Sequence, residues 1–313
     1  MFLAACGNKE AAPSPSSTGS PSPGASTKVS STPAPAAKTV KDSMGHEVTV
    51  PANPQRIIAS YLEDHLVALG VKPVAQWSVT NGIQDYLEAE LKGVPLINYD
   101  LPPEVVASFN PDFIIIGSES TVQKGLYEQY AKIAPTYVIG DATTKDWKKT
   151  LLTIGELLNK KEVAEKALKD YEQEAVKAKE KLKQTIGTQK ATILWLVQKQ
   201  FYLVDETLSS GAVLYGELGI TPSNLVTGIS KEAKGVWKPI TLEKLAEMDA
   251  DHIFLVNSDK TQGSETLNQA IWKSIPAVKA GHVYEMDSKG SWLYSGLIAS
   301  QKITADALKV FLK

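Results

Sequence analysis

The sequence is poor in the residues that build metal centres and covalent cross-links. Its 313 residues include one cysteine, Cys6, and one arginine, Arg56. One cysteine supports neither a disulfide framework nor a thiolate metal cluster. The four histidines are far apart in the sequence, at His46, His65, His252 and His282. Because zinc and manganese carriers need clustered ligands, no metal site built from protein side chains is expected.

Charge and hydropathy exclude two further classes. The net charge of -2 and the pI near 6.2 give no basic surface for nucleic acid. Beyond the first six residues, no run approaches the roughly 18 uninterrupted apolar residues of a membrane-spanning helix.

Catalytic motifs are missing as well. The sequence has no Gly-x-Ser-x-Gly, no glycine-rich phosphate loop followed by Lys-Ser/Thr, no His-Glu-x-x-His and no cysteine nucleophile in its body. These absences favour a binding protein. An α/β enzyme that acts in a cleft, and a structural protein with a passive core, remain the alternatives from other classes.

A segment that occurs twice is the most informative feature that is present. Glu104 stands eight residues before Asp112, and Glu243 stands eight residues before Asp251. Each copy predicts a short helix, a turn that contains the aspartate, and an apolar strand buried on both faces. The sequence therefore predicts an α/β protein of two similar lobes. Clefts between lobes are preferred sites for small ligands.

The N-terminal region has a different composition. Residues 7–41 consist largely of Ser, Pro, Ala, Thr and Gly, which cannot bury enough surface to fold, so a disordered tether is expected there. The preceding Leu3-Ala-Ala-Cys6-Gly7 resembles a bacterial lipobox, and residues 1–6 then resemble the remnant of a lipoprotein signal. That resemblance implies lipidation of Cys6 and a place on the outer face of the cytoplasmic membrane of a Gram-positive-like cell.

The body divides into three predicted regions. Residues 42–159 alternate strand and helix patterns and form the N-terminal lobe. Residues 160–187 are charged and almost free of Gly, with Glu and Lys at i,i+4 spacing, which predicts one long rigid helix. Its position between the two repeat copies favours a connecting strut over an ordinary surface helix. Residues 188–313 form the C-terminal lobe.

Several spaced motifs carry a family resemblance across residues 42–313. Their order and spacing resemble the iron-siderophore group of substrate-binding proteins of ABC importers, which shares its fold class with vitamin B12 and haem binders. The motifs are Asp42-x-x-Gly45-x-x-Val48-x-Val50-Pro51-x-x-Pro54-x-Arg56, Leu69-Gly-Val-Lys-Pro73, Asn110-Pro-Asp112, and Trp272-x-x-Ile275-Pro-Ala-Val278-Lys-Ala-Gly281-His-Val-Tyr284. Within the group, Ser291-Trp292-Leu-Tyr294-Ser-Gly296 resembles the segment that carries a ligand-contacting tryptophan in ferric-hydroxamate binders.

The resemblance implies specific partners. It implies a monomer that captures a ferric siderophore and delivers it to an ABC permease, with iron as cargo inside the chelator and no resident cofactor. It also implies that a glutamate on each lobe contacts basic residues of the permease, and Glu104 and Glu243 match those positions. A role limited to stabilising the first turn of a helix is the simpler interpretation of both.

The scarcity of arginine bears on the cargo. Three hydroxamates cancel the charge of ferric iron, whereas three catecholates leave an anion that arginine usually binds. A hydroxamate siderophore is therefore expected. However, ferric-hydroxamate binders often have arginines where this sequence has residues 98–100 and 208–211, so Lys199 or hydrogen bonds from Tyr and Ser would replace them. Ferric citrate, a mixed citrate-hydroxamate, a catecholate siderophore, cobalamin and haem stay open.

Candidate ligand-binding residues stand at predicted strand ends and in loops. Tryptophan and tyrosine combine apolar area with a hydrogen-bonding group, which suits an apolar chelate with an oxygen-rich edge. Core packing is the ordinary role of most of these residues, and Trp292 and Trp237 are the two favoured for ligand contact. The candidates are Trp77, Tyr99, Trp195, Lys199, Tyr202, Trp237, Asn257, Trp292 and Tyr294.

Overall fold

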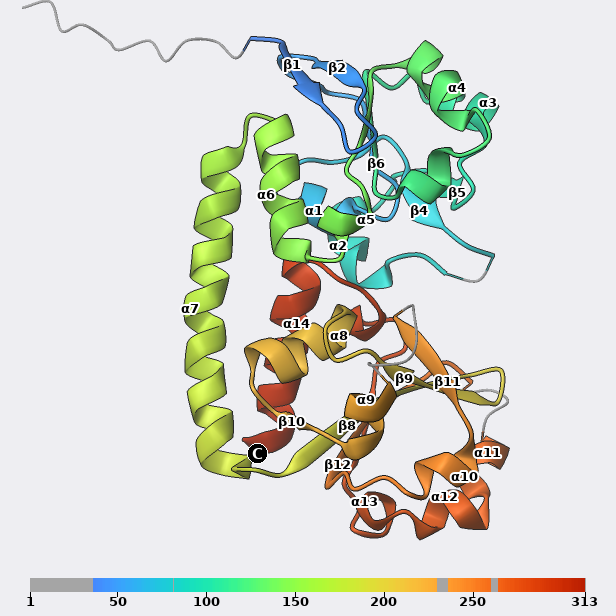
Figure 1. Cartoon of the computed structure of the whole chain (residues 1–313), viewed down its shortest axis with the longest axis vertical. Helices are drawn as coiled ribbons and strands as arrows, with labels where there is room; N and C mark the ends of the chain where they lie inside the picture. The colour runs from blue at the N-terminus through green and yellow to red at the C-terminus, as the bar shows by residue number, and fades with distance from the viewer. Residues whose placement is uncertain (1–35, 81, 230–235, 260–263, 313) are drawn as a thin grey trace, which may run out of the picture. The chain divides into compact units, whose positions relative to one another are not determined.

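The computed structural model describes residues 36–80, 82–229, 236–259 and 264–312. Residues 35–313 form one compact unit, whose elements are drawn in Figure 1. The predictions for Cys6 and for the tether up to residue 35 lie outside the described residues. Within those residues, no helix combines the length and the apolar character that crossing a membrane requires.

An antiparallel hairpin opens the folded part. Strand β1 (Lys38–Lys41) pairs with β2 (Glu47–Val50) around a turn at Gly45. The predicted end of the tether at residue 41 is wrong. Val40 lies opposite Val48 and packs against the core of the N-terminal lobe, so β1 belongs to the fold.

The N-terminal lobe contains two small parallel sheets. The first has the order β3-β6-β7 and the second pairs β4 with β5. The strands are β3 (Ile57–Ile58), β4 (Gln76–Ser78), β5 (Leu96–Asn98), β6 (Phe113–Ile116) and β7 (Thr136–Val138). The helices are α1 (Glu63–Ala68), η1 (Asp85–Leu87), α2 (Glu88–Leu91), α3 (Pro103–Ser108), η2 (Glu119–Val122), α4 (Leu126–Ile133), α5 (Asp141–Thr144) and α6 (Trp147–Leu157).

The C-terminal lobe is built on one mixed sheet of order β11-β9-β8-β12-β13, in which β10 also pairs with β8. The strands are β8 (Lys190–Val197), β9 (Gln200–Val204), β10 (Thr221–Pro222), β11 (Trp237–Ile240), β12 (His252–Asn257) and β13 (Val283–Met286). The helices are α8 (Ser209–Gly211), the π-helix η3 (Ala212–Glu217), α9 (Asn224–Ile229), α10 (Leu242–Leu245), α11 (Ser264–Asn268), α12 (Ala270–Ser274), α13 (Pro276–Lys279), η4 (Ser291–Leu293) and α14 (Leu297–Phe311).

The repeated sequence folds in the same way in both lobes, as α3 followed by β6 and as α10 followed by β12. The Asp112 carboxylate accepts the N–H groups of Gln55 and Arg56 at 2.7 and 2.9 Å. The Asp251 carboxylate accepts the N–H of Lys190 at 2.7 Å. In each lobe the repeated aspartate therefore anchors the chain at the start of the neighbouring strand, β3 or β8.

Two helices run between the lobes. The long helix expected over residues 160–187 is α7 (Lys161–Ile186), which contributes Ala175 to the core of the N-terminal lobe and Leu182 to that of the C-terminal lobe. Helix α14 does the same with Leu297 and Ala307. The predicted single connection is therefore incomplete, because α14 lies beside α7 and joins the same two cores (Figure 1).

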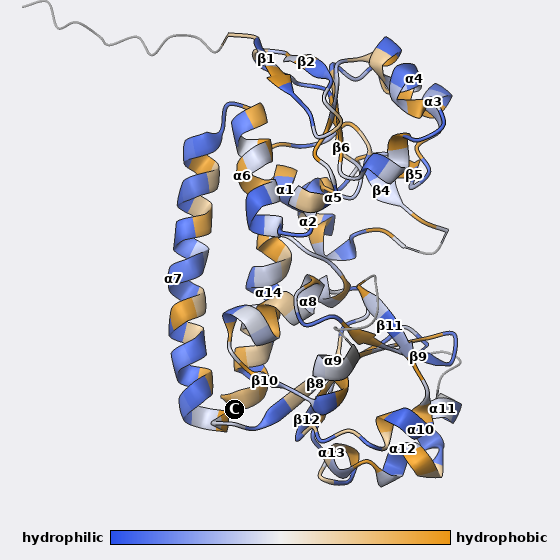
Figure 2. Cartoon of the chain, viewed as in Figure 1, coloured by the Kyte–Doolittle hydropathy of each residue, from blue (hydrophilic) through white to orange (hydrophobic). Residues whose placement is uncertain are grey.

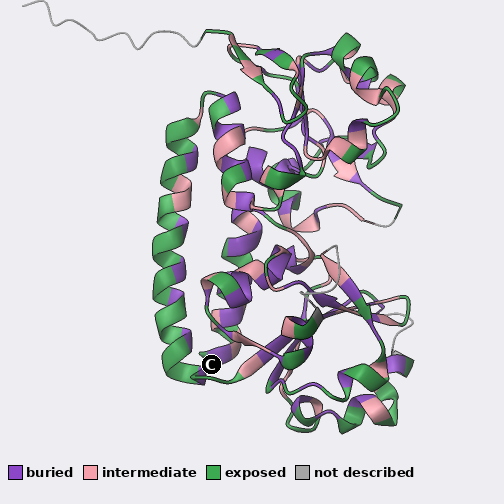
Figure 3. Ribbon diagram, in the orientation of Figure 1, coloured by how far each residue is buried: buried purple, intermediate pink, exposed green. Residues whose placement is uncertain are grey.

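The outer face of α7 is polar and exposed. Figure 2 shows hydrophilic residues along most of the helix, and Figure 3 shows that most of them are exposed. Lys161 pairs with Glu165 and Lys166 pairs with Asp170, both at i,i+4. Such exposed pairs contribute only about 0.3–0.5 kcal/mol each, so the helix depends mainly on its buried face.

Candidate functional site

Four aromatic rings gather where the N-terminal lobe meets the segment before α14. Tyr61, Trp77 and Tyr86 belong to the N-terminal lobe, and Tyr294 follows η4. The ring centroid of Tyr294 lies 6.1, 6.5 and 5.2 Å from those of Tyr61, Trp77 and Tyr86, respectively. We refer to these four residues as the junction cluster.

The junction cluster is partly open to solvent. Tyr61 directly follows the β3 region, has a φ angle of +65° and is 50 % exposed. Trp77, Tyr86 and Tyr294 are half-buried. A positive φ at a bulky residue is uncommon and is found preferentially at functional sites. The cluster therefore leaves aromatic surface partly exposed beyond the end of a core strand.

Tyr294 is held at its hydroxyl and at its backbone carbonyl. Its hydroxyl donates to the Ile83 carbonyl at 3.1 Å, and its own carbonyl accepts the Ser209 hydroxyl at 3.0 Å. Burial raises the pKa of Tyr294 well above its ordinary value, so its hydroxyl stays protonated and remains a donor. Through its backbone carbonyl and its hydroxyl, Tyr294 thus links α8 of the C-terminal lobe to the loop before η1 of the N-terminal lobe.

Three consecutive ionisable residues lie buried at the start of α1, beside the cluster. One Glu63 oxygen accepts the Trp77 backbone N–H at 2.6 Å. Burial raises the pKa of Glu63 to about 7 and that of Asp64 to about 6. Burial also lowers the pKa of His65 to about 4, so this imidazole is neutral near pH 7. His65 therefore does not neutralise the Glu63 or Asp64 carboxyl.

Several buried polar atoms on the same segments have no hydrogen-bond partner among the described residues. Buried polar groups are normally paired, so each exception needs a physical explanation, such as a bound water or ion. In this protein, the unpaired atoms belong to segments of both lobes that also carry or contact residues of the junction cluster. They include Ser60 Oγ, Glu63 Oε2, Gln84 Oε1, Ser210 Oγ and Ser291 Oγ.

A second aromatic group, which we call the sheet cluster, consists of Trp195, Tyr202 and Trp237 in the C-terminal lobe. Trp195 pairs with Tyr202 across β8 and β9, and their ring centroids are 5.4 Å apart. The Trp237 ring packs edge-on to Trp195 at 5.5 Å. All three rings are half-buried, so one face of the sheet offers them together. Trp195, Tyr202 and Trp237 were each predicted as candidates for ligand contact, and those contacts remain predictions.

Lys199 and Asn257 have structural partners beside this sheet. Lys199 stands in the β8–β9 turn, whose two central N–H groups donate to the Asp259 carboxylate at 2.7 and 2.6 Å. Its ammonium pairs with Glu265 at 3.0 Å. Asn257 is 6 % exposed, and its side-chain oxygen accepts the Asp259 N–H at 3.0 Å. Both residues therefore shape the turn, and their predicted ligand contacts remain predictions.

Trp292 occupies a different environment from the one expected. It is 1 % exposed, stacks on Phe254 with centroids 4.9 Å apart, and donates from Nε1 to Asp306 at 2.9 Å. The ring thus belongs to the core of the C-terminal lobe and offers no surface to a ligand in this structure. Burial therefore argues against the predicted ligand contact of Trp292, whereas the predicted ligand contact of the half-buried Tyr294 remains a prediction.

The remaining candidates divide clearly. Trp77 is the middle residue of β4 and is in the junction cluster, and its predicted ligand contact remains a prediction. Tyr99 is 61 % exposed, and no ring contact joins it to either cluster within the described residues. The sequence reasoning missed Tyr61 and Tyr86. The available sequence signal was the run of three ionisable residues at the start of α1. The structure buries this run beside the rings of Tyr61 and Tyr86.

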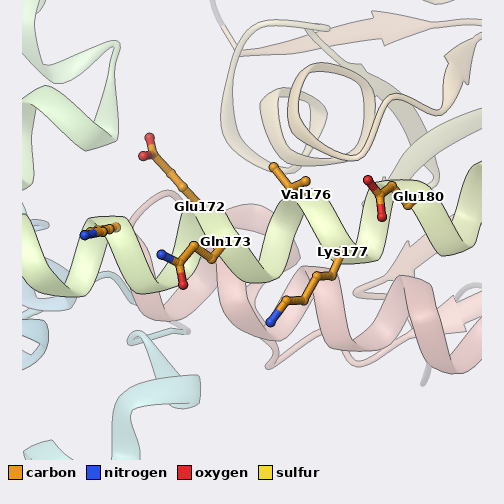
Figure 4. A pocket seen from close by; sticks show the side chains of 6 residues that line it. Glu172, Gln173, Val176, Lys177 and Glu180 are labelled. Atoms are coloured by element: carbon orange, nitrogen blue, oxygen red, sulfur yellow. The ribbon is translucent and has the colours of Figure 1, made fainter.

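Two surface hollows lie elsewhere. One runs along α7, and all six of its lining residues come from that helix, as the side chains in Figure 4 show. The other lies between β2 and the α4–β7 region. Neither includes a residue of the junction or sheet cluster. Among the described residues, no three His, Cys, Asp or Glu side chains are grouped so that they could hold a metal ion.

Comparison with known proteins places this arrangement in a family. A family model described as periplasmic binding protein matches residues 60–289. The chain belongs to the periplasmic binding protein family. Among relatives of this family, a probable siderophore-binding lipoprotein of Bacillus subtilis is 27 % identical over 88 % of each chain. An iron(3+)-hydroxamate-binding protein of the same species is 28 % identical over 97 % of this chain and 90 % of its own.

Solved structures of periplasmic binding proteins share the fold. A Staphylococcus aureus protein complexed with staphyloferrin B matches with a TM-score of 0.73 and 25 % identity over 87 % of this chain and 98 % of its own. A Bacillus subtilis protein described as a component of a ferrichrome ABC transporter matches with a TM-score of 0.73 and 24 % identity, over 88 % of this chain and 100 % of its own. The second likeness supports the two-lobed α/β fold alone.

Proposed function

We propose that the chain is a substrate-binding lipoprotein that captures a ferric siderophore, of hydroxamate type, at the lobe junction. It delivers this cargo to an ABC permease of the iron-siderophore class. The observation that carries the proposal is the junction cluster, in which Tyr294 meets three aromatic residues of the N-terminal lobe. Relatives over most of the chain are named for binding siderophores or ferric hydroxamates.

The only arginine in the sequence is held by backbone carbonyls, which supports a neutral chelate as the cargo. Arg56 Nε donates to the Asn110 carbonyl at 2.8 Å, and its terminal nitrogen donates to the Phe109 carbonyl. These bonds hold the turn between α3 and β6, so the guanidinium serves the repeat motif. Aromatic surface with neutral polar groups suits a tris-hydroxamate better than an anionic tris-catecholate, which calls for arginine.

The remaining parts of the proposal concern attachment and delivery. Cys6 would carry the lipid that holds the protein at the outer face of the cytoplasmic membrane. Glu104 and Glu243 are exposed in the first turns of α3 and α10, where two basic surfaces of a permease could reach them. The protein would act as a monomer without enzymatic activity, and ferric iron would be cargo and not a resident cofactor.

The test is a tryptophan-fluorescence titration of residues 36–313 with a ferric hydroxamate, a ferric catecholate and ferric citrate in parallel. Gallium complexes of the same chelators separate true binding from light absorption by iron. We expect saturable submicromolar binding of the hydroxamate alone. Preference for an anionic chelate would overturn the hydroxamate assignment, and no response to any chelate would overturn the siderophore assignment.

A further inference from the structure

The start of α14 is capped by a residue far away in the sequence. The first amides of this 15-residue helix, Ile298 N–H and Ala299 N–H, donate to the two carboxyl oxygens of Asp64 at 3.0 and 2.9 Å. Helix N-termini carry unsatisfied N–H groups and a partial positive charge, both of which a carboxylate satisfies. Asp64 belongs to α1 in the N-terminal lobe, so the cap connects two elements that no local motif joins.

Gly296, the residue before α14, is fitted to this contact. Its φ angle of +147° is one that glycine adopts readily and other residues do not. A β-carbon at this position would lie 2.2 Å from Asp64 Cγ. Position 296 therefore lacks a side chain of its own that could cap the helix, and the space is occupied by the carboxylate of Asp64.

The same carboxylate reaches the junction cluster. The Tyr86 hydroxyl donates to Asp64 at 3.0 Å, and the Tyr86 ring lies 5.2 Å from that of Tyr294. Tyr294 itself is only two residues before Gly296. Asp64 thus bonds directly to the start of α14, and it bonds to Tyr86, whose ring packs against that of Tyr294.

Two ion pairs between the lobes are more exposed than Asp64. Lys289 lies 3.6 Å from Asp85, with the lysine side chain 74 % exposed. Lys148 lies 3.4 Å from Glu217. Exposed ion pairs contribute little, whereas buried hydrogen bonds to a charged group contribute more. Asp64 is 1 % exposed, so its contacts define the geometry at this junction more strongly.

We propose that Asp64 is a positioning residue: it holds the Ser291–Gly296 loop, and with it Tyr294, in the geometry that binds ligand. This inference rests on the proposed function for its ligand readout. A positioning role differs from a role in stability alone, because it requires that Asp64 variants that remain fully folded bind ligand more weakly.

The experiment compares Asp64→Asn and Asp64→Ala with the wild type. Asp170→Asn and Asp170→Ala are matched controls, since they remove the same charge from an exposed position on α7. For each folded variant, amide hydrogen exchange is measured at Ile298 and Ala299, and affinity is measured with a ferric hydroxamate. We expect Asp64→Ala to speed exchange of these two amides and to weaken affinity, each by about tenfold, with Asp64→Asn intermediate.

Gly296→Ala tests the same contact from the other side, in case Asp64→Ala does not fold. It should reproduce the faster exchange and the weaker binding, and its effect should not add to that of Asp64→Asn. Faster exchange with unchanged affinity would overturn the positioning role. If the wild type binds no chelate, the proposed function fails. The inference is then tested by the NMR amide signals of Tyr294 and Gly296. It is overturned if Asp64→Asn leaves these two signals at their wild-type positions.

Discussion

Glu63 and Trp77 are joined by a hydrogen bond of 2.6 Å between a buried carboxyl oxygen and the Trp77 backbone N–H. The bond connects the start of α1 to β4 and places the Trp77 indole in the junction cluster. The second Glu63 oxygen has no partner among the described residues. A carboxyl that is buried with one oxygen unpaired is costly to ionise, and this cost makes stability depend on pH.

Glu63→Gln should therefore change the pH dependence of stability. The pKa of Glu63 is raised by burial to about 7, so its favourable contribution is complete at low pH and is lost as pH rises through 7. Relative to the wild type, the variant should gain up to about 3 kcal/mol of unfolding free energy between pH 5 and pH 9. Urea unfolding at both pH values measures this, and a difference independent of pH would contradict it.

Tyr294→Leu should weaken ligand binding in a folded protein. The substitution removes an aromatic ring that contacts three others, and such contacts contribute about 0.5–1.5 kcal/mol beyond the area they bury, so a loss of about tenfold in affinity is expected. Fluorescence titration with a ferric hydroxamate gives the value. Leu126→Ala, on α4 outside the cluster, is the control; equal affinities for both variants would argue against the junction cluster as the site.

Trp292→Ala should act mainly on stability. The ring is fully buried against Phe254, and truncating a buried tryptophan costs about 3–5 kcal/mol through the cavity that remains. Trp292→Phe, which keeps an aromatic ring, should cost less and should leave the affinity unchanged. Thermal unfolding and ligand titration separate the two effects. Wild-type stability with weakened binding would restore Trp292 as a ligand-contacting residue.

Glu104→Ala combined with Glu243→Ala should stop delivery without affecting capture. Both glutamates are exposed, and neither belongs to the junction cluster or the sheet cluster. We expect unchanged affinity for the chelate and iron uptake reduced about tenfold or more in cells, because complementary charges guide association. Glu128→Ala with Glu247→Ala removes the same charge at other exposed positions and should leave uptake intact. Normal uptake by the Glu104–Glu243 double variant would rule out docking through these residues.

Local sequence patterns determined most of the framework. The repeat predicted a helix and a buried strand in each lobe, and Asp112 and Asp251 occupy equivalent anchoring positions. The charged stretch predicted α7 to within a residue at each end. These predictions succeed because apolar periodicity, helix-forming residues and turn residues act over short distances along the chain.

Tertiary structure decided which aromatic residues could meet a ligand. Trp292 and Tyr294 are two residues apart, and the sequence favoured Trp292, yet Trp292 packs on Phe254 in the core and Tyr294 joins Trp77 and Tyr86. The sequence also gave no sign that Asp64 would cap α14, whose first amides lie more than 230 residues away. Burial and long-range hydrogen bonds depend on how distant segments fold against one another, and that information is spread over the whole chain and not contained in any local pattern.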